Sequence, residues 1–385
     1  TDKRNLRARA MGFAGFIGLS SVVAALTRHR PDVVFAMSPP LPIGIAGLAV
    51  ARLRRAPFVF NIQDVFPDAA VETGAITNRR IIAVAKWLER VSYHRAAAVT
   101  VLSDDLRDNV AAKVKPSRRA RVHVIPNFVD TEFIQPADRL TAYRRELGIG
   151  DGPVVLYAGN VGFSQSLEMV VDAAADFPDV TFLINGDGAA RRTLEERAAR
   201  LPNVRFSGYQ PKERVPEVLA TGDIHLVPLK KGLGRVSVPS KTYSILAAGR
   251  PVLAAIDPGT EVPRMLAASG GGVAVAPDDP AAFREALAGL LADLRQRRRW
   301  VRPGANGCWA PPRRGPWPSP TTSPPASAAS SCSPSTGPAT CPRSRARTAR
   351  SLGGMPIPLP YVAATARYDS MEYRRCGRSG VRLST

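Results

Sequence analysis

Residues 154–177, VVLYAGNVGFSQSLEMVVDAAADF, decide the fold class. The apolar run from Val154 to Ala158 predicts a buried strand, and a glycine turn follows it. From Leu167 to Phe177 apolar residues recur at helical spacing. A strand that leads through a glycine turn into a helix is the repeating unit of a parallel α/β sheet.

The same unit recurs through residues 1–300. Strand-like runs cover residues 32–37, 57–62, 98–102, 122–125, 154–158, 180–184, 204–206, 224–228, 251–255 and 273–276. Helical stretches lie between them, among them 78–96, 191–201 and 212–221, and Asp279 caps a last helix that runs to about Arg299. We therefore predict an α/β protein with two tandem Rossmann-like, doubly wound domains, residues 1–145 and 146–300, that face each other across a cleft.

Residues 301–385 have a different composition. They contain all four cysteines, twelve arginines, no lysine and two acids, and they supply about half of the net charge of +21. A segment so rich in Pro, Arg and Ser cannot bury enough apolar surface to offset the entropy lost on ordering, so we predict a disordered tail. A frame-shifted, non-native tail and a basic disordered extension both stay open.

The charge does not indicate a nucleic-acid partner, because no aromatic stacking platform accompanies the basic residues. Residues 1–300 contain no cysteine, as is usual in a reducing cytoplasm. Near the start, residues 11–26 form an uncharged run between basic flanks, and it is short for a membrane span of about 20 residues. A buried helix of an α/β layer and a helix in the membrane interface are both open interpretations.

Ligands of doubly wound sheets bind at the carboxyl ends of strands, and two turns there carry glycines. In residues 158–166, Gly162, Gln165 and Ser166 stand where backbone N–H groups favour a phosphate, although a turn without a ligand would look the same. Residues 184–191, with Gly186, half-match a dinucleotide motif, and we interpret them as a turn that borders a nucleotide.

Two further strand ends carry charged candidates. In residues 229–243, Ser240 is a candidate N-cap, which places Lys241 in the first helical turn, where a cation is unfavourable unless an anion is bound. Lys241, Arg235 and the helix N-terminus would then hold a diphosphate, and a solvated basic loop is the alternative. In residues 60–68, Asp64 follows a buried strand and suits a hydrogen bond to a hydroxyl, unless it caps a helix.

Seven stretches stand in the order and spacing of one known family: residues 30–41 (RPDVVFAMSPPL), 101–103 (VLS), 124–131 (VIPNFVDT), 156–159 (LYAG), 203–210 (NVRFSGYQ), 238–241 (VPSK) and 247–252 (AAGRPV). The chain resembles the retaining GT-B glycosyltransferases of family 4, once called group 1, in the branch that assembles bacterial O-antigen and capsule. The resemblance implies transfer of a sugar with retention from a nucleotide-diphosphate sugar, with UDP as the nucleotide at family level. It also implies no bound metal and no permanently bound cofactor.

The same resemblance implies a cellular location and an acceptor substrate. The second domain would bind the donor, and the first would bind an undecaprenyl-diphosphate-linked saccharide whose hydroxyl accepts the sugar. The enzyme would be cytoplasmic and peripheral to the inner face of the cell membrane. Lys241 and Arg235 would stabilise the departing diphosphate, Glu261 would orient the donor and Asp64 the acceptor. The remaining donor-binding candidates are Gly162, Gln165, Ser166, Gly186, Tyr209, Gln210 and Ser240.

Several departures from the family pattern keep other interpretations open. Val236 and Ser244 stand where many relatives carry two glutamates, and Gln63 stands in place of a histidine. The family's opening strand with its glycine-rich loop is missing, so we expect a first domain that is incomplete at its start. The alternatives are a catalytically dead fragment, a basic binding protein, and a nucleotide-sugar epimerase of the same fold. An epimerase needs acids and a histidine in the cleft, but His123 and His225 lie in strands that look buried.

Overall fold

The computed structural model describes residues 6–74, 76–300, 373–376 and 381–384. The chain forms two compact units, Thr1–Ser319 and Pro320–Thr385. In the second unit, β11 (Tyr373–Cys376) and β12 (Val381–Ser384) pair antiparallel. The rest of the tail, with its predicted disorder, lies outside the described residues.

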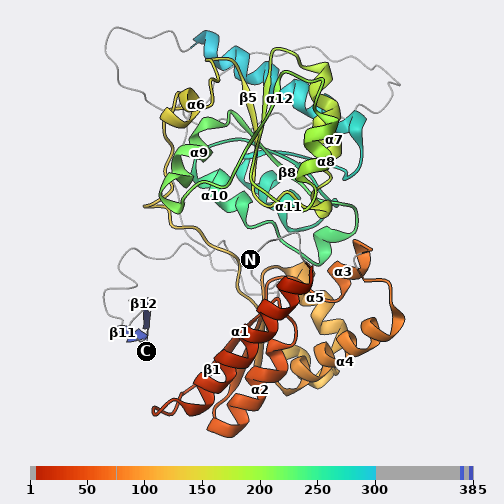
Figure 1. Cartoon of the computed structure of the whole chain (residues 1–385), viewed down its shortest axis with the longest axis vertical. Helices are drawn as coiled ribbons and strands as arrows, with labels where there is room; N and C mark the ends of the chain where they lie inside the picture. Colours follow the sequence, from red (N-terminus) through yellow and green to blue (C-terminus); the bar gives the residue numbers. More distant parts are fainter. Residues whose placement is uncertain (1–5, 75, 301–372, 377–380, 385) are drawn as a thin grey trace, which may run out of the picture. The chain divides into compact units, whose positions relative to one another are not determined.

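The first unit contains two parallel sheets (Figure 1). One has the order β1-β2-β3-β4, and the other has the order β10-β9-β8-β5-β6-β7. The strands are β1 (Val34–Ser38), β2 (Phe58–Ile62), β3 (Ala98–Val101), β4 (Val122–Val124), β5 (Val154–Ala158), β6 (Thr181–Asn185), β7 (Val204–Ser207), β8 (Ile224–Pro228), β9 (Val252–Ala255) and β10 (Gly272–Val275). This confirms the predicted α/β class, and each of the ten predicted strands is present. The domain boundary at residue 145 stays a prediction.

Helices connect the strands as the sequence predicted. They are α1 (Leu6–Leu26), α2 (Ile43–Arg54), α3 (Asp68–Glu72), α4 (Arg79–Arg95), α5 (Asp104–Lys113), α6 (Ala142–Glu146), α7 (Leu167–Ala173), α8 (Arg191–Arg197), α9 (Val215–Thr221), α10 (Lys241–Ala247), α11 (Glu261–Ser269) and α12 (Pro280–Trp300). Asp279 caps α12 as predicted, since its Oδ1 accepts from the backbone N of Ala281 at 3.1 Å and of Ala282 at 3.0 Å.

The direction of winding in the second sheet reverses between β5 and β8. From β5 the chain proceeds outward through β6 to β7, and from β8 it proceeds the other way through β9 to β10. The loops that leave two neighbouring strands at such a point diverge, and this opening is where ligands of doubly wound sheets bind. The loops after β5 and β8 are therefore the first place to look for a site.

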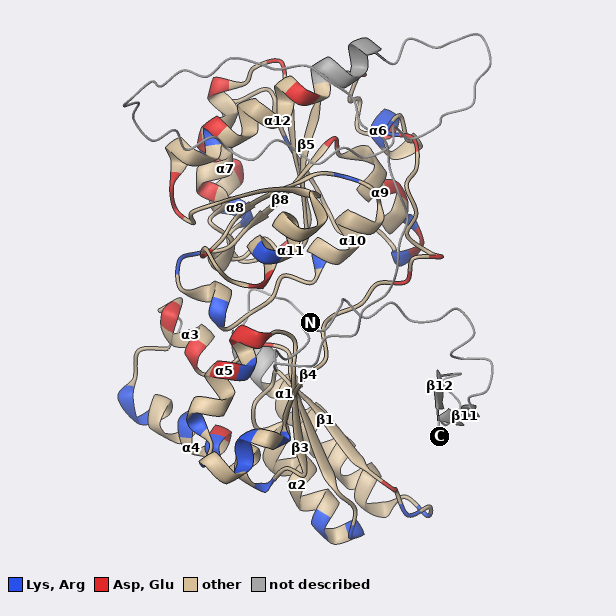
Figure 2. Cartoon of the chain, turned by 180° about the vertical axis from the view of Figure 1, so that it is seen from behind, with Lys and Arg blue, Asp and Glu red and all other residues tan. Residues whose placement is uncertain are grey.

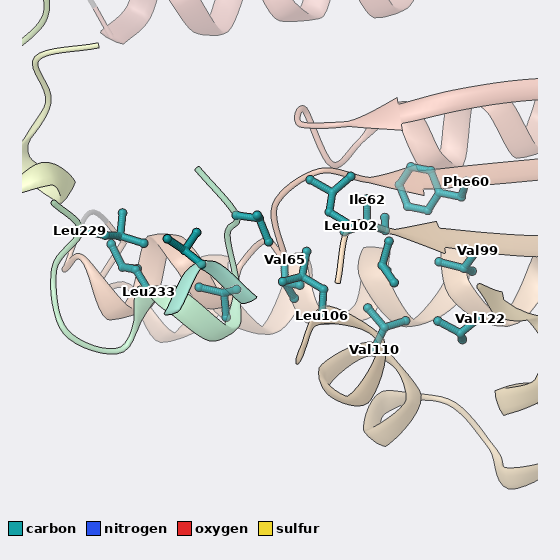
Figure 3. Close-up of a cluster of buried hydrophobic side chains, with 14 of the residues drawn as sticks. Phe60, Ile62, Val65, Val99, Leu102, Leu106, Val110, Val122, Leu229 and Leu233 are labelled. Carbon is teal, nitrogen blue, oxygen red and sulfur yellow. The ribbon is translucent and has the colours of Figure 1, made fainter. Parts of the chain in front are cut away.

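One apolar cluster extends from the first sheet into the loop that follows β8 (Figure 3). It contains Phe60 and Ile62 of β2, Val65 beyond that strand, and Leu229 and Leu233 after β8. Since all of these side chains are at most 5% exposed, burial of apolar surface joins the loop to the first sheet. Other positions of the first sheet stay open to solvent, because Phe35 and Met37 of β1 are 60% and 50% exposed.

Helix α1 corrects the interpretation of residues 11–26 as a buried helix. None of these residues is buried, and Met11, Leu19 and Leu26 are at least 70% exposed. A long apolar run usually indicates a buried helix. Here α1 packs against α2, and most of residues 11–26 are exposed. No helix in the described part of the chain is long and apolar enough to cross a membrane.

Candidate active site

A buried lysine stands at the opening between β5 and β8. Lys241 begins α10, and its Nζ lies 3.6 Å from the centre of the Tyr157 ring in β5. This Nζ is buried and has no hydrogen-bond partner among residues 6–74 and 76–300. Burial lowers the pKa of Lys241 to about 7. Because a buried ammonium without a counter-ion is unfavourable, the site favours an anionic ligand.

The glycine turns after β5 and β6 pack directly on each other. The Gly159 N–H donates to the carbonyl of Asn185 at 2.9 Å, and a Cβ on Gly186 would lie only 1.8 Å from the Gly159 carbonyl oxygen. Gly186 has φ +152°, which also requires glycine. Arg191 closes the second turn by donating to the carbonyls of Gly186 at 2.7 Å and Ser207 at 3.1 Å. Backbone packing therefore explains Gly186, and its contact with a donor stays a prediction.

The predicted side chains of the first turn bind within the protein. The N–H of Gly162 donates to Oε1 of Gln165 at 3.0 Å. Ser166 has φ +42° and donates its hydroxyl to Asp278 at 2.5 Å, and the same carboxylate accepts from the N–H of Lys231 at 3.0 Å. Gln165 and Ser166 thus shape the loops around Lys241, and a direct contact of either with a donor is untested.

Asp257, in the loop after β9, is a residue that the sequence analysis missed. Its carboxylate accepts from the N–H groups of Gly232 at 3.0 Å and Gly234 at 2.9 Å, and so fixes the basic loop that leads to α10. Arg235 follows in this loop with an exposed side chain. In the described chain Arg235 forms no hydrogen bond or ion pair, so it is open to a ligand. The signal available in the sequence for Asp257 was its position just beyond a predicted strand, where loops of doubly wound sheets bind ligands.

Two other predicted residues stand at the starts of α10 and α11. Ser240 occupies the N-cap position of α10, but its side chain makes no cap hydrogen bond and its φ of −59° and ψ of −26° are already helical. Glu261 begins α11 and pairs with Arg264 at 3.2 Å, and Arg264 also pairs with Asp105 of α5 at 2.7 Å. Burial, and then the carboxylate of Glu261, raise the pKa of Tyr243 to about 12. Glu261 therefore lies near α10, although its contact with a donor sugar is untested.

Asp64 lies where the first domain contacts the basic loop. It forms an isolated antiparallel bridge with Ser237, and the N–H of Val65 donates to the carbonyl of Val236 at 2.8 Å. Burial raises the pKa of Asp64, and a hydrogen bond with Ser237 opposes that shift. Asp64 does not cap α3, whose N-cap is Pro67, so the alternative interpretation as a helix cap is wrong. Its role toward an acceptor stays a prediction.

The remaining candidates follow β7. Tyr209 donates its hydroxyl to the carbonyl of Asp187 at 3.0 Å, and Gln210 donates its side-chain amide to the carbonyl of Gly208 at 3.3 Å. Tyr209 is 48% exposed. Tyr209 therefore borders the turn that begins at Gly186, and the donor contacts of both residues stay predictions.

The histidines give no support to epimerase chemistry. His225 is fully buried as predicted, its Nε2 lies 2.9 Å from the carbonyl of Leu219, and burial lowers its pKa to about 4. His123 is exposed, so the prediction that it is buried was wrong: β4 lies at the edge of its sheet and turns this side chain to solvent. In the described ranges no three His, Cys, Asp or Glu residues lie together as metal ligands, and the prediction of no bound metal remains untested.

Comparison with known proteins agrees with this arrangement. The family description "Glycosyl transferase 4-like domain" matches residues 3–127, and "Glycosyl transferases group 1" matches residues 152–293. WcaI of Escherichia coli K12, described as a colanic acid biosynthesis glycosyl transferase, is 29% identical over 77% of this chain and 72% of its own. The 2-deoxystreptamine N-acetyl-D-glucosaminyltransferase of Streptomyces fradiae is 30% identical over 74% of this chain and 71% of its own.

Solved structures share the fold. The crystal structure of Anabaena HepE in complex with UDP-glucose aligns with a TM-score of 0.58 at 18% identity, over 74% of this chain and 73% of that one. The GT-B fold that the sequence suggested is therefore confirmed. With both domain families matched and relatives aligned across both domains, this chain belongs to the group 1 (family 4) glycosyltransferases.

Proposed function

We propose that this enzyme transfers a sugar from a nucleotide-diphosphate sugar, with UDP as the nucleotide, to a hydroxyl of a lipid-linked saccharide in cell-surface polysaccharide synthesis. Lys241 is the observation that carries the proposal, because it is a buried cation without an anion at the opening between β5 and β8. The UDP-glucose complex of HepE and the colanic acid description of WcaI support the donor class and the process.

The role of Lys241 and Arg235 follows from where negative charge develops during the transfer. When the bond between the sugar and the diphosphate breaks, the anomeric carbon becomes oxocarbenium-like and negative charge builds on the leaving diphosphate. Preorganised positive charge at that position lowers the barrier. Lys241 would provide it from the buried side and Arg235 from the exposed loop, with retention of configuration as in the family resemblance.

Exposed residues of α4 support a peripheral place at the cytoplasmic membrane. Ile81, Val84 and Trp87 recur every three residues and are 54%, 57% and 59% exposed. The same helix carries Arg79, Arg80, Lys86, Arg90 and Arg95, and Figure 2 shows blue Lys and Arg positions along α4. An apolar strip with basic neighbours binds anionic lipid surfaces. Co-sedimentation with anionic and with zwitterionic vesicles tests this, and Trp87→Ser should weaken binding to the anionic ones.

The test of the proposed function is thermal unfolding of the full chain with and without UDP, followed by release of UDP from UDP sugars. A ligand that binds only the folded protein adds about 2.7 kcal/mol at a hundredfold excess over Kd. An upward shift with turnover supports the transferase. No shift with any nucleoside diphosphate contradicts it.

A catalytically dead protein that still binds nucleotide sugars is a second candidate. The exposure of Phe35 and Met37 on the edge strand β1 favours it, since apolar side chains left open to solvent weaken the packing of the first domain. Binding of UDP without turnover of any donor, alone or with saccharide acceptors, is the outcome that selects this candidate.

A further inference from the structure

The nearest group to the Lys241 ammonium is the face of an aromatic ring. Its Nζ lies 3.6 Å from the centre of the Tyr157 ring, well inside the range in which a ring quadrupole attracts a cation. Tyr157 belongs to β5 and Lys241 to α10, so the contact joins the two loops that diverge at the reversal in the second sheet.

The ring itself is fixed. Tyr157 is 1% exposed, and its hydroxyl donates to the carbonyl of Asn160 in the first glycine turn at 2.6 Å. Burial raises the pKa of Tyr157, so the phenol stays neutral and presents the lysine with a ring face, not with a negative oxygen. The strand and this hydrogen bond therefore determine where the ring face lies.

The backbone of the first glycine turn passes beside Nζ. A Cβ on Gly159 would lie 3.5 Å from Nζ and 3.6 Å from the Tyr157 hydroxyl, so the bare glycine backbone passes next to both groups. His225 is the titratable group whose charge couples to Lys241, and it stays neutral because burial lowers its pKa to about 4. In the described part of the molecule, the ring is thus the group that fixes the ammonium.

We propose that Tyr157 is a positioning residue: its ring face holds the side-chain nitrogen of Lys241 between the first glycine turn and α10, so that the donor diphosphate meets a nitrogen already in place, and this nitrogen is an ammonium in the complex. This inference rests on the proposed function. The competing explanation is that Tyr157 only fills the core of the second sheet, as Phe182 does in the neighbouring strand at 1% exposure.

The experiment is a double-mutant cycle on UDP affinity, measured by calorimetry on the full chain. Tyr157→Leu keeps apolar bulk and removes the ring, Tyr157→Phe keeps the ring and removes the hydroxyl, and Lys241→Met removes the cation. Phe182→Leu is the matched control for loss of a buried aromatic side chain. We expect Tyr157→Leu to weaken UDP about tenfold, Tyr157→Phe to stay within about threefold, and Phe182→Leu to leave affinity unchanged.

The cycle separates positioning from packing. In the Lys241→Met background, Tyr157→Leu should have no further effect on affinity, whereas a packing role predicts the same loss in both backgrounds. Should Tyr157→Leu fail to fold, phenylalanines with one, two or three ring fluorines at position 157 keep the shape and weaken the ring quadrupole in steps. Affinity that falls with each fluorine supports the inference, and affinity independent of fluorination overturns it.

UDP binding by the wild-type protein distinguishes a failure of the proposed function from a failure of the inference about Tyr157. If wild-type protein binds no nucleoside diphosphate, the proposed function fails and this inference fails with it. If wild-type protein binds UDP and Tyr157→Leu binds equally well, the inference alone is overturned.

Discussion

Lys113 in the first domain is partly buried, and the Nζ of Lys241 in the second domain is fully buried. The groups around the two lysines differ. The Nζ of Lys113 lies 2.7 Å from Asp68 and 2.7 Å from Glu89, whereas Lys241 has the face of Tyr157 and no carboxylate partner among the described residues. Lys113 is the cation that pairs with the buried Glu89 and the partly buried Asp68. The difference indicates that a paired lysine contributes to the stability of the first domain, whereas the unpaired Lys241 is the group that we propose binds the donor.

The largest expected effect is on turnover. Lys241→Ala should lower kcat/KM about a hundredfold or more, because loss of one preorganised positive group has that order of effect on a developing anion. Release of UDP from the donor is the measurement, and Lys231→Ala, an exposed lysine of the same loop, is the control. Near-normal turnover of Lys241→Ala would remove the proposed mechanism.

The complementary change in the first domain should affect stability instead. Lys113→Met leaves Glu89 and Asp68 without their cation and should lower the free energy of unfolding by about 2 kcal/mol. Denaturant unfolding measures this, and the Kd for UDP should stay within about twofold of wild type. A large loss of UDP affinity in Lys113→Met would contradict the assignment of Lys113 to stability and of Lys241 to donor binding.

The pH dependence of UDP binding tests whether Lys241 is neutral in the empty protein, unlike a lysine that is paired with carboxylates. With a pKa of about 7, Lys241 is neutral above that pH in the empty protein, so binding to the diphosphate must take up a proton. Affinity should therefore fall about tenfold per pH unit above about pH 7, where the phosphates of UDP are already ionised. Calorimetry across this range measures it. Lys241→Arg, always charged, should give a flat profile, and a flat wild-type profile contradicts the assignment.

The smallest effect is expected at the exposed strand of the first sheet. Met37→Ala should change the free energy of unfolding by less than about 0.5 kcal/mol, because Met37 is 50% exposed. Leu156→Ala in β5, a fully buried side chain, should cost about 3 kcal/mol and serves as the matched comparison. Equal losses at both positions would show that β1 is covered in solution.

The strands were predictable because each is a short apolar run, and all ten were found within about two residues at either end. The place of Lys241 in the first turn of α10 was also predictable, whereas its role toward an anion stays a prediction. Both predictions depend only on residues that are neighbours in the sequence.

The remainder depends on which segments meet in space. Asp257 is one acid in a loop, and nothing near it in sequence shows that its carboxylate receives two N–H groups from a loop some 25 residues earlier. The exposure of α1 was left open for the same reason: an apolar run suits a buried or a membrane-surface helix, and only tertiary contacts decide whether other elements cover it. Tyr157 was read as part of a strand, and its contact with Lys241 needed the sheet order.

The packing of the two glycine turns has a consequence for engineering. A Cβ on Gly186 would meet the carbonyl of Gly159, and one on Gly188 would lie 2.3 Å from the carbonyl of Val161, so the turns constrain each other's sequence. Libraries that randomise these glycines will consist mostly of misfolded variants. Phe163 and Tyr209, 55% and 48% exposed beside the same turns, lack this backbone constraint, so we expect substitutions there to leave the fold intact.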